Sequence, residues 1–140
     1  MIGYTQWTVP DRTLNSDSVE VTGIASSVAE ASATFTPQDP TASIDRATQM
    51  MSPESAERFK ADFATVAKDL GGRNVSAQAS TVSAGVEAIG PEAASVAVVL
   101  RGTQTSPGKP TDSAVLALRV SLSKTDGRWL VEDVSPLHSR

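Results

Sequence analysis

The feature that most constrains this chain is a change of hydrophobic period at Gly71 and Gly72. Before these glycines, apolar residues recur at the three- to four-residue spacing that is typical of helices, and after them they alternate with polar residues, as in strands. Glycine can also take the left-handed conformation that closes a helix. The sequence therefore predicts an α+β domain in which helices come first and a sheet follows.

Three helices are predicted ahead of Gly72. The first starts at a cap formed by Asp17 or Ser18, and its apolar positions are Val21, Ile24, Val28, Ala31 and Phe35. The second follows Asp39-Pro40 and turns Ile44, Ala47 and Met51 to one side. The third opens at Ser52-Pro53 with a stripe of Ala56, Phe59, Phe63 and Leu70. Residues 1–18 are expected to be an irregular lead-in to a single domain over residues 19–140.

Four strands are predicted after Gly72, joined by hairpins. They cover residues 75–88, 94–100, 116–122 and 128–134, with a tight turn at Asp126-Gly127. The apolar alternation of the first strand changes phase across Ser80-Thr81, which indicates a β-bulge and a bend. We therefore expect a curved four-stranded antiparallel sheet whose concave face holds the three helices, closing over the helix that carries Phe59 and Phe63.

Composition excludes several classes of function. The 140-residue chain has a net charge of −4, which argues against binding to nucleic acid. It contains no cysteine, so disulfides, thiol catalysis and thiolate metal sites are absent. No metal constellation or cofactor motif is found, and no apolar stretch is long enough for a membrane helix. We therefore expect no cofactor.

Three segments carry a resemblance to a known family. They are Phe35-Thr36-Pro37-Gln38-Asp39-Pro40 with Ile44-Asp45-Arg46-Ala47, then Met51-Ser52-Pro53-Glu54 with Phe59, and finally the hairpin from Leu118 to Val134 around Asp126-Gly127-Arg128-Trp129. Together they resemble the mammalian-cell-entry-associated (Mce-associated) proteins of actinobacteria, which have the nuclear-transport-factor-2-like cone fold. The match covers about residues 20–135. The closing hairpin is common across the whole superfold, so the first segment is the more specific one.

The resemblance implies a non-enzymatic accessory domain on the outer side of the membrane, in the cell envelope. It would make contacts with protein partners of a lipid-transporting complex, and an N-terminal membrane helix absent from this chain would anchor it. An alternative is the similarly folded periplasmic domain of conjugation or type IV secretion assembly factors. A further alternative is a small-ligand-binding or isomerase- or cyclase-like member of the superfold.

The enzyme alternative has few candidate residues. Enzymes of this superfold combine an acid or base with a donor such as tyrosine in the mouth of the cone. Here the only histidine is His138, near the end of the chain, and the only tyrosine is Tyr4, in the lead-in. Of the adjacent Glu132 and Asp133, one is expected to face inward or to lie at an edge. An inward Asp133, on the face of Trp129, would be a candidate base, although such a residue more often satisfies a hydrogen bond or marks the end of the strand. We predict no catalytic residues.

Two groups of residues are candidates for binding. The hypothetical pocket lining for a lipid or small apolar ligand is Met50, Met51, Phe59, Phe63, Trp129 and Asp133. The hypothetical interface, for a protein partner or for a homodimer through the sheet face, is Arg101, Arg119 and Ser121.

Overall fold

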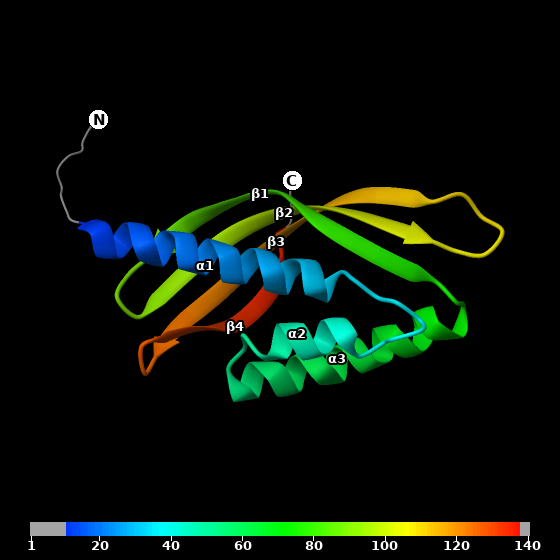
Figure 1. Cartoon of the computed structure of the whole chain (residues 1–140), viewed down its shortest axis with the longest axis horizontal. Helices are drawn as coiled ribbons and strands as arrows, with labels where there is room; N and C mark the ends of the chain where they lie inside the picture. Colours follow the sequence, from blue (N-terminus) through cyan, green and yellow to red (C-terminus); the bar gives the residue numbers. More distant parts are fainter. Residues whose placement is uncertain (1–10, 138–140) are drawn as a thin grey trace.

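The computed structural model describes residues 11–137, with side chains from Asp17 onward. Its helices are α1 (Asp11–Ser32), α2 (Ala42–Thr48) and α3 (Pro53–Gly72), and its strands are β1 (Ser76–Ile89), β2 (Ala93–Thr105), β3 (Asp112–Thr125) and β4 (Arg128–Pro136). The strands form one sheet in the order β1-β2-β3-β4, with every neighbouring pair antiparallel (Figure 1). The predicted α+β order of elements is confirmed.

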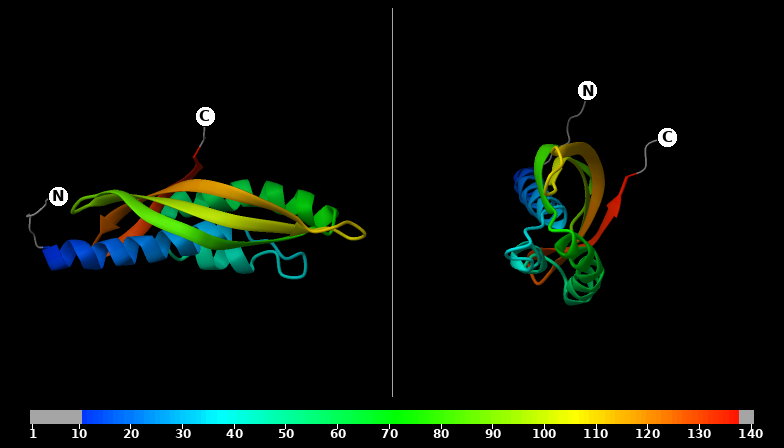
Figure 2. Two further views of the ribbon diagram at one scale, coloured as in Figure 1. Left: turned by 90° about the horizontal axis from the view of Figure 1, so that it is seen from above. Right: turned by 90° about the vertical axis from the view of Figure 1, so that its right-hand side faces the viewer.

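The sheet is strongly curved, and the helices lie on its open side (Figure 2). Register shifts interrupt the pairing of β1 between Thr81 and Ser83 and again between Val86 and Ala88. The first shift is the predicted bulge, and its extra residue, Val82, points to solvent with 57% of its surface exposed. Each bulge increases the bend of the strand and turns the following side chains to the other face.

The main core lies between α1 and the sheet. Its members are mostly small or β-branched: Val21, Ala25, Val28, Ala29, Ala31, Ala47, Met51, Ala94, Val96, Val98, Leu100, Val120, Leu122, Trp129 and Val131. Helix α1 packs against all four strands, whereas α3 packs mainly against α2 and β4. The helix that the sheet closes over is therefore α1, and the expectation that it would be the helix of Phe59 and Phe63 was wrong. The alanines of α1 allow the close approach that such a curved sheet requires.

A second, smaller cluster lies beneath α3. It consists of Phe35, Phe63, Leu70, Val75 and Ala77, with Phe59 at its border. The ring centroids of Phe35 and Phe63 are 6.2 Å apart, and those of Phe59 and Phe63 are 5.8 Å apart. These separations and tilted rings are favourable for aromatic pairs. The three phenylalanines thus hold α3 in place.

Helix α1 starts earlier than predicted. Residues 11–18 are helical, whereas we expected them to be irregular, and residues 1–10 of the predicted lead-in lie outside the described residues. The reason is tertiary: Asp17 is only 8% exposed, and its carboxylate lies 3.8 Å from Nζ of Lys124 on β3. Docking on the sheet thereby stabilises a helical turn whose sequence has a weak helical pattern.

The ends of the other helices also differ in detail. Ser52 caps α3 as predicted, because its side chain accepts a hydrogen bond from the backbone N–H of Ser55. The left-handed residue after α3 is Asn74, with φ of 56°, and not a glycine. Asparagine tolerates this conformation better than most residues. Helix α2 begins at Ala42 after Thr41, so the predicted start at Asp39-Pro40 was too early.

The segment around α2 joins the two edges of the sheet. At one end, Phe35 and Ala77 exchange two backbone hydrogen bonds of 2.8 Å along the edge of β1. At the other, Val131 of β4 donates to the carbonyl of Met50 and accepts from the N–H of Ser52. Phe35 and Met51 therefore lie in β-bridges and not in the helices predicted for them. We call residues 35–52 the edge-joining segment.

Candidate functional site

The inner face of the sheet is covered along only part of its length. Strand β4 ends at Pro136, which pairs with Leu118, and α1 ends at Ser32. Beyond that point β2 and β3 continue as a hairpin that projects past α1 (Figure 1). Leu116 pairs with buried Leu100 on this inner face, yet 39% of its surface is exposed. An apolar part of the sheet is consequently left uncovered.

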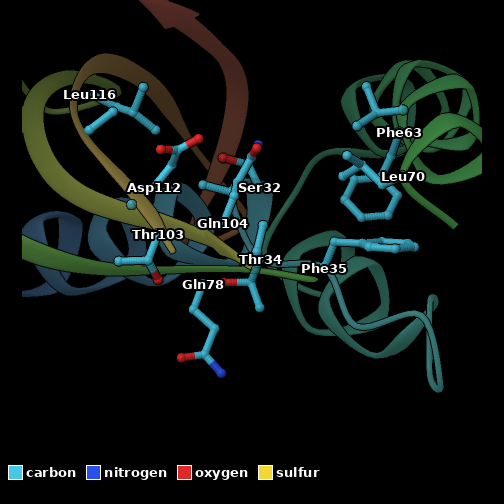
Figure 3. A pocket seen from close by; sticks show the side chains of 15 residues that line it. Ser32, Thr34, Phe35, Phe63, Leu70, Gln78, Thr103, Gln104, Asp112 and Leu116 are labelled. Atoms are coloured by element: carbon cyan, nitrogen blue, oxygen red, sulfur yellow. The ribbon is translucent and has the colours of Figure 1, made fainter. Parts of the chain in front are cut away.

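A cavity of about 440 Å³ occupies this uncovered region and is open to solvent on one side. It is lined by Ser32, Ala33, Thr34, Phe35, Phe63, Val66, Leu70, Ala77, Gln78, Gly102, Thr103, Gln104, Asp112, Ala114 and Leu116. In Figure 3, Phe35, Phe63 and Leu70 face Leu116 across the hollow. We call this cavity the open-end pocket.

The open-end pocket has an apolar floor and a polar rim. Asp112 is the only ionisable side chain among its lining residues, and it is exposed. The volume falls within the range of small-molecule and side-chain binding sites. General acid–base catalysis needs a titratable group held against the substrate with a second group to stabilise charge. This lining offers one solvated carboxylate, which suits binding better than chemistry.

The structure separates the residues that were predicted to line one pocket. Phe63 lines the open-end pocket. Met51, Phe59 and Asp133 border a much smaller hollow of about 60 Å³ between α3 and β4. Met50 is half-buried at the edge of the main core. The six residues therefore do not form a single ligand site.

Trp129 and Asp133 have different surroundings from those expected. Trp129 is 3% exposed and belongs to the main core, where it fills space. Asp133 is exposed and pairs with Ser121, because a register shift at Glu132 turns the chain between Val131 and Asp133. The expectation that Asp133 points inward beside Trp129 was wrong for this reason.

The extra residue of β4, Glu132, holds α3 against the sheet. Its carboxylate accepts hydrogen bonds from the hydroxyls of Ser52 and Ser123, and its backbone carbonyl accepts one of 2.9 Å from the guanidinium of Arg58. Ser52 is also the N-cap of α3, so the negative charge lies at the favourable end of the helix dipole. Sequence reasoning treated Glu132 only as the neighbour of Asp133 and missed this role.

The three predicted interface residues all lie on the outer face of the sheet. Arg101 is exposed and Ser121 is half-buried. Arg119 reaches across β2 to Glu87 of β1, with Nε 2.8 Å from Oε1, and Ser95 donates to the same carboxylate. The bonds from Arg119 hold the pKa of Glu87 below its usual value, and the same pair raises the pKa of Arg119. Arg119 is thus already paired within the sheet.

Two predictions concern residues that the structure does not describe, and two others concern metal sites and membrane helices. Tyr4 and His138 lie outside the described residues. Among the side chains that the structure describes, residues 17–137, no three His, Cys, Asp or Glu gather as a metal site would require. None of the described helices combines the length and apolar character needed to cross a membrane.

Sequence reasoning missed most of the open-end pocket. Leu116 was correctly placed on the inner face, but nothing in its alternation showed that α1 ends before reaching it. Gly102 also contributes, since a Cβ there would lie 3.5 Å from Cδ1 of Leu116. One signal was available in the ranges of the predicted strands: the third strand starts at Leu116, whereas Val134, the last predicted residue of the fourth, pairs with Val120.

Comparison with known proteins identifies the fold. No protein-family model and no curated protein matches this sequence. Among solved structures, the chain is similar to an IcmL-like type IV secretion system protein from Legionella pneumophila, with a TM-score of 0.70 and 10% identity over 95% of this chain and 98% of that one. It is similar to the periplasmic domain of DotI, with a TM-score of 0.71 and 8% identity over 94% and 99% of the two chains. The VirB8 protein of Agrobacterium tumefaciens gives a TM-score of 0.67 and 11% identity over 94% and 99%.

These similarities show that the chain has the nuclear-transport-factor-2-like fold in the form seen in VirB8. The identities are too low to carry more than the fold. The resemblance to Mce-associated proteins stays a prediction.

Proposed function

We propose that this chain is a non-catalytic, extracytoplasmic domain that makes protein–protein contacts in a type IV secretion or conjugation assembly. The observation that carries the proposal is the similarity of fold over nearly the whole length of secretion-system domains, one of them described as periplasmic. The open-end pocket supports it, because its lining lacks a second titratable group beside Asp112. A fold supports many functions, so the assignment needs a direct test.

The test is genetic and biochemical. We expect deletion of the gene to abolish DNA or protein transfer by the organism that encodes it, and the intact gene to restore it. A photo-crosslinking amino acid at Val115, which is exposed on the outer face, should capture components of the same assembly. Normal transfer by the deletion strain would refute the proposal.

The outer face is the proposed surface for a homodimer or a protein partner, through Arg101, Arg119 and Ser121. Because Arg119 is bonded to Glu87, an Arg119→Glu variant would place two carboxylates side by side across β2. The mass of this variant in solution tests the dimer. An Arg119→Glu protein that still dimerises would remove this surface from consideration.

A second candidate function is the accessory role in Mce-type lipid transport. The specific observation that favours it is the apolar floor of the open-end pocket, together with the Phe35 to Arg46 segment. Native mass spectrometry of the purified chain distinguishes the two candidates, since co-purified lipid would support lipid transport. An anchoring membrane helix ahead of Met1 fits both candidates and stays a prediction.

A further inference from the structure

The open-end pocket is where exposed apolar side chains converge. In the described part of the chain the large hydrophobic residues that stand out to solvent are Val19, Val66, Val82, Val115 and Leu116. Two of them, Val66 on α3 and Leu116 on β3, line this pocket and are 50% and 39% exposed. Apolar surface gathered around a hollow marks a binding site, unlike single exposed residues, which are ordinary.

The shape of the pocket is held by its surroundings. Phe35, Phe63 and Leu70 are each less than 10% exposed and pack together as one wall. The opposite wall is the paired backbone of β2 and β3, and Gly102 leaves depth beside Leu116. A preformed hollow of this kind binds without first ordering its own side chains.

The charge at the rim selects the kind of occupant. Asp112 is the one ionisable residue of the lining, so the formal charge among these residues is negative. The chain as a whole carries a net charge of −4. A carboxylate or phosphate head group would be repelled here, whereas a lysine or arginine beside apolar groups would be attracted.

We propose that the open-end pocket receives a basic amphipathic segment of a partner protein. The apolar side chains of that segment fill the hollow between Phe63 and Leu116, and a lysine or arginine beside them lies against Asp112. This resembles the way amphipathic helices enter apolar grooves. The inference rests on the proposed function and names the kind of partner that the secretion assembly would supply.

The test uses the purified chain and three probes. They are a short dye-labelled peptide of leucine and lysine, the same peptide with glutamate in place of lysine, and dodecanoate as a competitor. Binding is followed by fluorescence anisotropy at low and high salt. We expect the lysine peptide to bind, and to bind more weakly as salt screens the acidic rim. The glutamate peptide should not bind, and dodecanoate should not displace the lysine peptide.

Variants locate the binding site. Leu116→Ser should weaken binding of the lysine peptide about tenfold, by loss of one buried leucine contact. Its matched control is Val115→Ser, because Val115 is the preceding residue on the same strand and points to the outer face. Asp112→Asn should weaken binding about twofold to fivefold. Its control is Asp126→Asn, beyond the opposite end of β3. Val66→Ser on the facing wall is the second test should Leu116→Ser be poorly folded by circular dichroism.

Each result decides between alternatives. Equal binding of both peptides, displacement by dodecanoate, or equal effects of Leu116→Ser and Val115→Ser would overturn the inference. Loss of transfer on deletion of the gene, without peptide binding to the pocket, refutes this inference and leaves the proposed function standing. Site-specific peptide binding with normal transfer by the deletion strain refutes the proposed function alone.

Discussion

The two halves of β3 share one inner face, yet the surroundings of that face are opposite in the two halves. In the second half, Val120 and Leu122 are 0% and 2% exposed beneath α1 and beside β4. In the first half, Leu116 continues the same inner face but is 39% exposed. Alternation therefore determines which face a side chain occupies, whereas burial depends on whether α1 and β4 extend that far.

The largest expected effect comes from a pair of leucines at the boundary between these halves. Leu100 and Leu116 are cross-strand partners on the inner face, and only Leu100 is fully buried. We expect Leu100→Ala to lower the free energy of unfolding by about 3 kcal/mol and Leu116→Ala by about 1 kcal/mol. Urea denaturation of the two variants measures both. Equal losses would mean that the open half is as well packed as the covered half.

The next effect concerns a contact that holds α1 against β1, at the strand position that pairs with Leu100. Thr81 pairs with Leu100, and its backbone N–H and hydroxyl both donate to Oε2 of Glu30, at 2.9 and 2.6 Å. The bulge beside Thr81 interrupts the strand pairing, so the side chain of Glu30 supplies the hydrogen-bond acceptor for Thr81. Glu30→Gln should cost about 1–2 kcal/mol, because a charged acceptor is lost. Glu20→Gln, exposed on the same helix, is the control and should have almost no effect.

A smaller effect is expected at the start of α3, the helix whose Phe63, Val66 and Leu70 line the open-end pocket. Ser52 caps α3 and donates to Glu132, whereas Thr41 at the start of α2 makes no side-chain cap bond. Ser52→Ala should therefore cost about 1 kcal/mol and Thr41→Ala much less. Hydrogen exchange should accelerate in α3 and stay unchanged in α1. Faster exchange throughout both helices would show that α3 is not a separate unit.

The smallest effect belongs to the outer face, which both halves share. The pKa of Glu87 is lowered from its ordinary value of 4.5 by Arg119, so the stabilisation is present above that value and is lost as pH falls through the lowered pKa. The Glu87→Gln variant should not show this small loss of stability at acidic pH. Denaturation of the two proteins between neutral and acidic pH gives the comparison. Identical acid-side curves would show that the pair contributes nothing to stability.

The sequence predicted the order of elements because periodicity reports local geometry. The phase change at Ser80-Thr81 even located a bulge, at Val82. Periodicity failed where two elements meet. The bulge at Glu132 depends on the hydrogen bonds of that residue to Ser52 and Ser123. This bulge places Asp133 on the outer face. The open-end pocket likewise results from the relative lengths of α1, β3 and β4 in space, which no periodicity describes.

The edge-joining segment has a consequence for how this domain behaves at high concentration. An unpaired strand edge is a template on which a second chain can add, and it is a common route to amyloid-like association. Here Phe35 takes up the hydrogen bonds of Ala77 on β1, and Met50 and Ser52 take up those of Val131 on β4. Copies crowded into one assembly would therefore find backbone-mediated polymerisation blocked at the start of β1 and in the middle of β4.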